Sequence, residues 1–172
     1  EISRGSTGAK TITASWSPEQ YSIRYVLDGG VNHTGNPSNY TVEDTVRFSP
    51  PTKNGYRFLG WSPSEIPRGS TGEKTVTAAW EANEYAILFD ANGGTGTTSY
   101  QRRHDDTLGE LPQAFRTGYT FLGWYPQKDG GTQGKSSDRV TGQKTYYAHW
   151  VINRYTARFH SAGTGDGATI LR

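Results

Sequence analysis

The chain has 172 residues, a net charge of +2, no cysteine and no methionine. The lack of cysteine excludes a disulfide framework and cysteine-ligated zinc. No apolar run reaches the ~18–20 residues of a membrane-spanning helix, so we expect no direct membrane insertion. Its 18 basic and 16 acidic residues are scattered along the sequence, which argues against nucleic-acid binding. Because the chain starts at Glu1 and has no methionine, we expect it to be a segment of a longer protein.

Three patterns recur along the chain. A closing pattern, G-x-K-T-x-x-A-x-W, covers residues 8–16, 72–80 and 142–150. An opening pattern, Y-x-I-x-[YF] followed by Asp/Asn-Gly-Gly, covers 21–30 and 85–94 and returns in part at 155–159, and a central G-Y-x-F-L-G-W pattern covers 55–61 and 118–124. We therefore predict complete repeats at 21–80 and 85–150, the C-terminal part of a preceding repeat at 1–16 and the N-terminal part of a following repeat at 155–172.

Within each repeat the predicted elements follow the same order. Residues 21–27 and 85–91 alternate large apolar with mostly polar side chains, which predicts a half-buried strand. The Asp/Asn-Gly-Gly that follows supplies the positive φ of a tight turn. A short helix or a short strand then falls near residues 44–49 and 106–111, before a proline-rich bend, the central aromatic strand and the closing strand. Four-residue linkers at 17–20, 81–84 and 151–154 join the copies.

The three patterns, in this order and repeated, resemble the Listeria–Bacteroides repeat family, which includes the internalin B-repeat. Tyr21, Ile23, Tyr25 and the Asp28-Gly-Gly turn carry the opening pattern, and the resemblance covers nearly the whole chain. It implies a mainly β fold built of small α+β, β-grasp-like units that fold independently in a tandem array. It also implies a place on secreted or cell-wall-attached bacterial proteins, between a functional head and an anchor, and it supplies no catalytic residues.

Polar groups that could carry chemistry are better explained by structure. Asp44 and Asp106 recur before a threonine, which is typical of a turn or cap, and Lys10, Lys74 and Lys144 recur where a charge at the start of a strand would blunt a sheet edge. The phosphate-loop motif requires glycine directly before the lysine, with a helix after it, and the closing pattern has neither. The four histidines fall at unrelated repeat positions. We therefore predict no catalytic residue, no metal site and no cofactor.

Aromatic residues divide into recurring and non-recurring sets. The recurring ones, together with Trp16, are expected to form the structural core: Trp16, Tyr56, Phe58, Trp61, Trp80, Tyr119, Phe121, Trp124 and Trp150. Tyr125, Tyr146 and Tyr147 stand where the first repeat has Ser62, Val76 and Thr77. These three tyrosines are therefore the candidates for contact with a ligand.

Two functions fit these observations. The first is a non-catalytic, elongated spacer or stalk in an adhesin-like extracellular protein. The second is an accessory module that binds a glycan or protein of a host or cell-wall surface and is attached to a carbohydrate-active enzyme. The incomplete repeats at 1–16 and 155–172 predict head-to-tail self-association. Alternatively, the structural boundary is shifted from the sequence repeat, and Trp16 then packs on residues 21–61 of its own chain.

Overall fold

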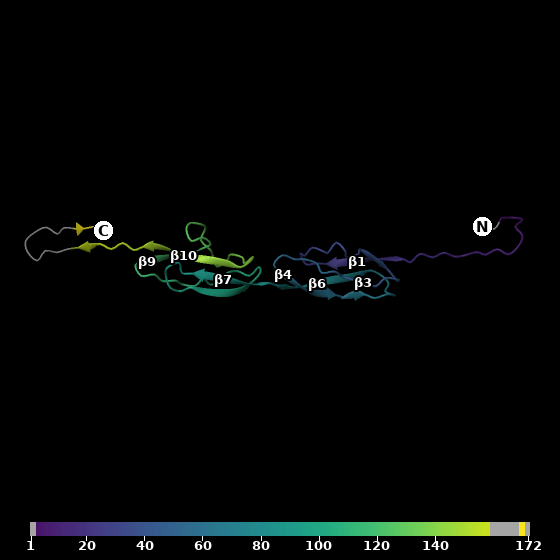
Figure 1. The fold of residues 1–172 in the computed structure, drawn as a ribbon, viewed down its shortest axis with the longest axis horizontal. Helices are drawn as coiled ribbons and strands as arrows, with labels where there is room; N and C mark the ends of the chain where they lie inside the picture. Colours follow the sequence, from purple (N-terminus) through teal and green to yellow (C-terminus); the bar gives the residue numbers. More distant parts are fainter. Residues whose placement is uncertain (1–2, 159–168, 171–172) are drawn as a thin grey trace, which may run out of the picture. The chain divides into compact units, whose positions relative to one another are not determined.

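A computed structural model describes residues 3–158 and 169–170 and divides the chain into two units (Figure 1). The first unit comprises Glu1–Asn54 and Phe58–Trp80, and the second comprises Gly55–Arg57 and Glu81–Arg172. The boundary between the units falls after Trp80, where the first predicted repeat ends, and Gly55–Arg57, a short stretch of that repeat, groups with the second unit.

The first unit is built on a mixed sheet. Its strands are β1 (Gln20–Val26), β2 (Asn39–Thr41), β4 (Tyr56–Ser62) and β6 (Lys74–Ala82), in the order β2-β1-β6-β4. The first and last strands, β1 and β6, lie parallel at its centre, and β2 runs antiparallel to β1. A separate two-stranded sheet pairs β3 (Val46–Arg47) with β5 (Glu65–Ile66).

The second unit repeats this arrangement. Its sheet has the order β8-β7-β10-β9, with β7 (Glu84–Asp90), β8 (Thr98–Arg103), β9 (Tyr119–Tyr125) and β10 (Lys144–Ile152). Strands β7 and β10 are parallel, and the pairing of β10 with β9 shifts register between His149 and Trp150. A β-bulge of this kind inserts one residue into a strand, so that Phe121 and Trp124 both face the core. The chain continues into β11 (Ala157–Arg158), which pairs with β12 (Thr169–Ile170).

Each unit has its own hydrophobic core, drawn from one sequence repeat. The first core contains Ile23, Tyr40, Val46, Ile66 and Val76. The second core contains Ile87, Phe89, Ala91, Leu108, Ala114, Trp124, Val140, Tyr146 and Ala148. Strand residues of both cores alternate with exposed neighbours, as a sheet with one buried face requires.

Both turns that follow the opening strands have the positive φ that the sequence predicts. Asp28 and Asn92 both have φ of 47°, and Gly29 and Gly93 follow with φ of 83° and 86°. A glycine tolerates this left-handed region without a steric penalty, so the Asp/Asn-Gly pair ends the opening strand in both repeats.

The mainly β fold class is confirmed, and residues 3–158 and 169–170 contain no helix. The structure therefore favours the short strand over the short helix at residues 44–49, where β3 forms. Residues 106–111 form no helix either, and Thr107 there bridges to Arg139. Within the described ranges, no helix could cross a membrane.

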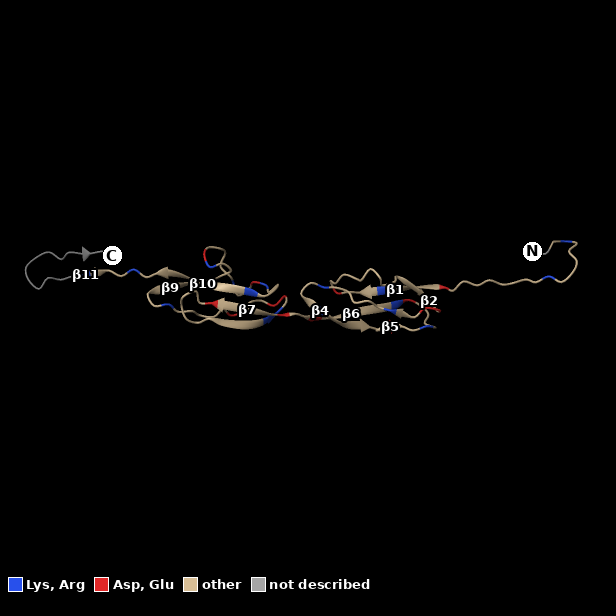
Figure 2. Ribbon diagram, viewed as in Figure 1, with Lys and Arg blue, Asp and Glu red and all other residues tan. Residues whose placement is uncertain are grey.

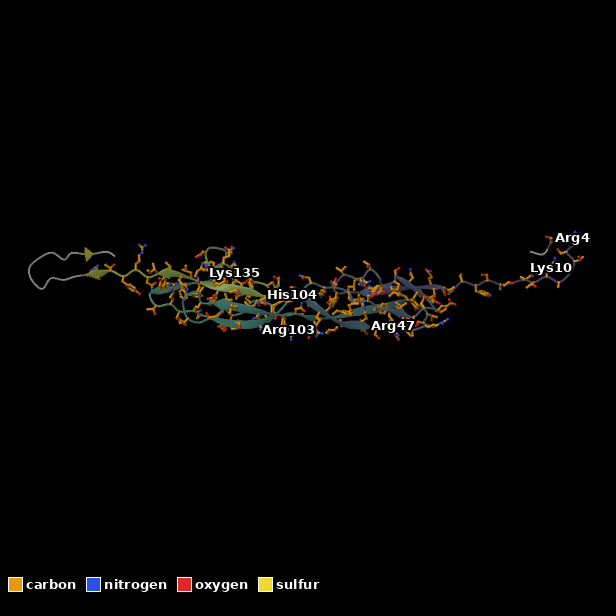
Figure 3. All side chains as sticks on the ribbon, in the orientation of Figure 1. Arg4, Lys10, Arg47, Arg103, His104 and Lys135 are labelled. Carbon is orange, nitrogen blue, oxygen red and sulfur yellow. The ribbon has the colours of Figure 1, made fainter. Side chains whose placement is uncertain are left out.

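Residues 3–19 form no strand and are exposed, and Arg4 and Lys10 lie on this segment (Figure 3). Trp16 is 91% exposed. The expectation that Trp16 packs on residues 21–61 is therefore wrong, and so is its assignment to a core in this chain. The physical reason is that the strands that hold Trp80 have no copy ahead of Trp16 in this sequence. Of the partial third repeat, residues 159–168 and 171–172 lie outside the described residues.

Candidate functional site

The recurring tryptophans are tied to the backbone in the same way in both repeats. Trp80 Nε1 donates to the carbonyl oxygen of Leu27 at 2.9 Å, and Trp150 Nε1 donates to that of Ala91 at 3.0 Å. Trp61 and Trp124 likewise donate to the carbonyls of matched bend residues, at 3.0 and 2.7 Å. Because each indole N–H is already used within the fold, these side chains serve the structure of the repeat.

The phenylalanines and tyrosines that were expected in the core do not all pack in the same surroundings. Phe58 packs edge-on against Trp61 and Trp80, with ring centroids 5.4 and 5.5 Å away, and Phe121 packs against the second core. Tyr56 and Tyr119, like Phe58 and Trp80, belong to neither core cluster. Tyr56 contacts the ring of His104, and Tyr119 contacts the guanidinium of Arg116.

The recurring acids close turns. Asp44 Oδ2 accepts hydrogen bonds from the backbone N–H and the hydroxyl of Thr41 at 2.7 and 2.9 Å, and these bonds lower the pKa of Asp44. Asp106 Oδ2 accepts from the backbone N–H of Arg103 at 3.2 Å in the same position of the second repeat. The prediction of a structural turn is confirmed at both positions.

The recurring lysines do not protect a sheet edge. Lys74 and Lys144 start β6 and β10 as expected. Both strands, however, occupy interior positions of their sheets, so the prediction of an edge-blunting charge is wrong. Strand order depends on long-range pairing, which the local sequence around a lysine does not reveal.

His104 is the one buried charged or polar residue among the described ranges. In the second unit its ring lies between Tyr56 and Tyr85, with centroids 5.4 and 6.1 Å away, and its backbone N–H donates to the carbonyl of Asn83 at 2.8 Å. Asn83 in turn donates its own N–H to the carbonyl of Gly55 at 2.9 Å. These contacts attach Gly55–Arg57 to the second unit, and no group of three or more ligating side chains gathers around them or elsewhere in the described residues.

The three candidate tyrosines separate in the structure. Tyr146 is only 4% exposed and stacks on Phe89, with ring centroids 5.6 Å apart. Its prediction as a ligand contact is therefore wrong. Successive side chains of a strand point to opposite faces, so Tyr146 turns into the core, where the first repeat buries Val76, and Tyr147 turns outward.

Tyr125, Tyr147 and His149 form what we call the outer aromatic patch. Tyr125 and Tyr147 are cross-strand partners on β9 and β10, and the Tyr125 ring stacks on His149 with centroids 3.9 Å apart and planes at 8°. His149 Nε2 also contacts the carbonyl oxygen of Gln127 at 2.9 Å. Each member is partly exposed, and the first repeat has Ser62, Thr77 and Ala79 at the matched positions.

A cleft of about 920 Å³ opens on the second unit. Its lining includes Gly94, Phe115, Arg116, Tyr119, Phe121 and Trp150. The guanidinium of Arg116 lies 3.9 Å from the centroid of the Tyr119 ring, and Phe115 is 69% exposed at the cleft. Sequence reasoning missed Phe115 and Arg116, although a comparison of the two copies could have found them, because Thr52 and Lys53 replace them in the first repeat.

Charged residues of both signs are interspersed along the strands and loops (Figure 2). Most of the ion pairs, such as Arg47 with Glu65 at 3.4 Å, join exposed side chains, which contribute about 0–1 kcal/mol each. In the described part of the chain the charges of both signs are mixed, so they give no basis for inferring a polyanionic or polycationic ligand.

Comparison with known proteins finds one matching family and several relatives. The family described as the Listeria-Bacteroides repeat domain matches residues 21–79 and 85–149. A protein of Evansella cellulosilytica named as a Gly-rich membrane protein is 30% identical over 93% of this chain and 19% of its own length. Internalin H of Listeria monocytogenes is 27% identical over 78% of this chain and 26% of its own length. The chain thus spans about a fifth to a quarter of the curated relatives it matches.

Proposed function

The chain belongs to the Listeria–Bacteroides repeat family, and we propose that it is a spacer segment of a bacterial secreted or cell-wall-attached protein. In this function the repeats hold an adhesin-like head away from the cell wall and carry out no catalysis. The observation that carries the proposal is the duplication of a unit with its own hydrophobic core.

The linkers between the repeats are short, and their backbone is hydrogen-bonded. Strand β6 ends at Ala82 and β7 begins at Glu84, so of the predicted four-residue linker only Asn83 lies outside a strand. The N–H of Asn83 is bonded to Gly55 at 2.9 Å, and Asn153, its counterpart after the second repeat, donates to Gly118 at 2.8 Å. A linker whose backbone is hydrogen-bonded at each repeat has fewer conformations than a flexible tether.

The use of the recurring polar groups also supports a non-catalytic function. Among the polar groups that both copies retain, the indole N–H groups and the carboxylates of Asp44 and Asp106 are engaged in hydrogen bonds within the fold. A catalytic acid or base needs a proton-transfer position that is open to substrate. These groups instead form hydrogen bonds within turns and to backbone carbonyls.

The same family and relatives support an extracellular location. One relative is an internalin and another is named as a membrane protein, which favours the bacterial cell surface for the longer protein. Immunogold labelling of thin sections of cells with an antibody against this segment tests the location. Labelling confined to the cytoplasm would contradict it.

Small-angle X-ray scattering of the whole chain tests the spacer function. A compact globule of this length would have a radius of gyration of about 16 Å, and a spacer should exceed that value clearly. An insertion of Gly-Ser-Gly after Asn83 should broaden the distribution of dimensions, whereas the same insertion in the loop after Gly130 should not. A compact profile for the unmodified chain would remove the proposal.

The outer aromatic patch favours a second candidate, a glycan contact on the second repeat. Stacked, partly exposed rings at Tyr125 and His149 give an amphipathic surface of the kind that binding sites use. A glycan array probed with the whole chain and with Tyr125→Ala tests it, with Ser62→Ala in the first repeat as the matched control. Binding that survives Tyr125→Ala, or an array with no bound glycan, would end this candidate.

A further inference from the structure

The cleft of the second unit contains a cation that its neighbours do not neutralise. At the matched place in the first unit, Lys53 Nζ lies 3.5 Å from Asp28 Oδ2. In the second repeat Asn92 replaces Asp28, and its amide donates to the carbonyl of Ala148 at 3.1 Å. Within residues 3–158 and 169–170, Arg116 has no carboxylate at ion-pair distance.

Arg116 is held in a position that suits a carboxylate. Its guanidinium stacks on the Tyr119 ring, 3.9 Å from the centroid, which contributes a cation–π attraction and restricts the side chain. Stacking uses the face of the guanidinium and leaves its N–H edges free for a bidentate contact with a carboxylate. No hydrogen bond from this side chain to the described part of the chain competes for them.

Apolar surface lies beside this cation. Phe115 is 69% exposed where the first repeat has Thr52, and the Trp150 ring lines the same cleft. The indole N–H of Trp150 is used by Ala91, so the cleft receives only the apolar ring. The backbone here is preformed, because Thr95 and Phe115 exchange both of their N–H to carbonyl hydrogen bonds, at 2.7 and 3.0 Å.

We propose that this cleft binds an acidic peptide segment of another protein, with a carboxylate on Arg116 and an adjacent apolar side chain against Phe115 and Trp150. Aromatic residues and arginine are the residue types enriched at protein–protein interfaces and at their hot spots. A polyanionic glycan would require a series of cations, and Arg116 is the one cation in the described lining. The cleft is separate from the outer aromatic patch, with which it shares no lining residue, and the proposal does not depend on the spacer function.

Selection from a phage-displayed library of random heptapeptides against the whole chain tests the proposal. We expect enriched peptides to share an acidic residue next to an aromatic or aliphatic one. Their affinity should fall roughly tenfold or more for Arg116→Gln, because glutamine cannot make the charge-assisted, bidentate contact with a carboxylate. Phe115→Thr should also weaken binding, whereas Lys53→Gln and Tyr125→Ala should not.

An ¹⁵N NMR titration with one enriched peptide locates the site and shows that the variants fold. Saturable shifts should concentrate at residues 93–95, at 115–121 and at the indole of Trp150, and the rest of the Arg116→Gln spectrum should match that of the unmodified chain. The proposal is overturned by the absence of enrichment, by peptides that bind Arg116→Gln equally well, or by equal shifts at residues 29–31 of the first unit. Shifts of the cleft by tetragalacturonate with no peptide enriched would assign it to a glycan and overturn it as well.

Discussion

Replacing Trp124 with alanine should unfold the second unit and spare the first. Trp124 is 1% exposed, and its ring packs edge-on against Phe89 and Phe121, with centroids 5.1 and 5.4 Å away. Truncation of a buried aromatic side chain costs about 3–5 kcal/mol. It also leaves the carbonyl of Pro112 without its 2.7 Å hydrogen bond, for about 1 kcal/mol more.

That loss is large against the stability of one unit. At about 0.05–0.15 kcal/mol per residue, a unit of about 65 residues is stable by roughly 3–10 kcal/mol. For a domain of this size each kcal/mol lowers the Tm by about 4–8 °C, so the total loss of about 4–6 kcal/mol should lower the Tm of the second unit by at least about 16 °C or unfold it outright. The matched change, Trp61→Ala in the first repeat, should cost less because Trp61 is only partly buried.

Differential scanning calorimetry of the whole chain and both variants measures these shifts, and ¹⁵N NMR identifies which unit has unfolded. Trp124→Ala should remove the dispersed signals of residues 85–150 while those of residues 21–54 persist. Simultaneous loss of both units would refute the reasoning, since it requires that the two cores be independent. So would a smaller effect for Trp124→Ala than for Trp61→Ala.

Three further changes test other features. Hydrogen bonds lower the pKa of Asp44. Its contribution to the free energy of unfolding is therefore present above the ordinary carboxyl pKa of about 3.9 and is lost as the pH falls through the lowered folded-state pKa. Thermal melts of Asp44→Asn should show a lower Tm at pH 7 but an unchanged Tm in acid. Gly94→Ala should destabilise the second unit by about 1–3 kcal/mol, because a Cβ there would lie 2.6 Å from the Trp150 ring. A Cβ at Gly142 meets nothing within 4 Å, so Gly142→Ala should leave the stability measured by urea unfolding unchanged. Head-to-tail pairing predicts association that grows with concentration in analytical ultracentrifugation and disappears when residues 1–16 are deleted; a monomer at all concentrations would contradict it.

Local patterns in the sequence were sufficient for the repeat and its fold class. Period-two alternation over residues 21–27 and 85–91 predicted strands that the structure contains as β1 and β7, because the side chains of a strand alternate between its two faces. The Asp/Asn-Gly turns were equally predictable, since only a few residue types tolerate positive φ. Comparison of the two copies also separated the structural acids at Asp44 and Asp106 from variable surface charges.

Pairing between strands far apart in the sequence decided which side chains are buried and which are exposed. Adjacent tyrosines 146 and 147 look alike in sequence, and only the register of β10 against β7 and β9 sends the first into the core and the second to the surface. The interior position of Lys74 follows from the parallel pairing of β1 with β6, and the exposure of Trp16 could not be read from its copy of the closing pattern. The uncompensated charge of Arg116 likewise depends on which side chains surround it in the cleft, where it lies beside Gly93 of the preceding turn. The sequence alone therefore determined which elements form and that they form twice, because strands and turns are encoded by neighbouring residues. The tertiary structure decided which faces, clefts and charges remain open to a partner, because those depend on residues far apart in the chain.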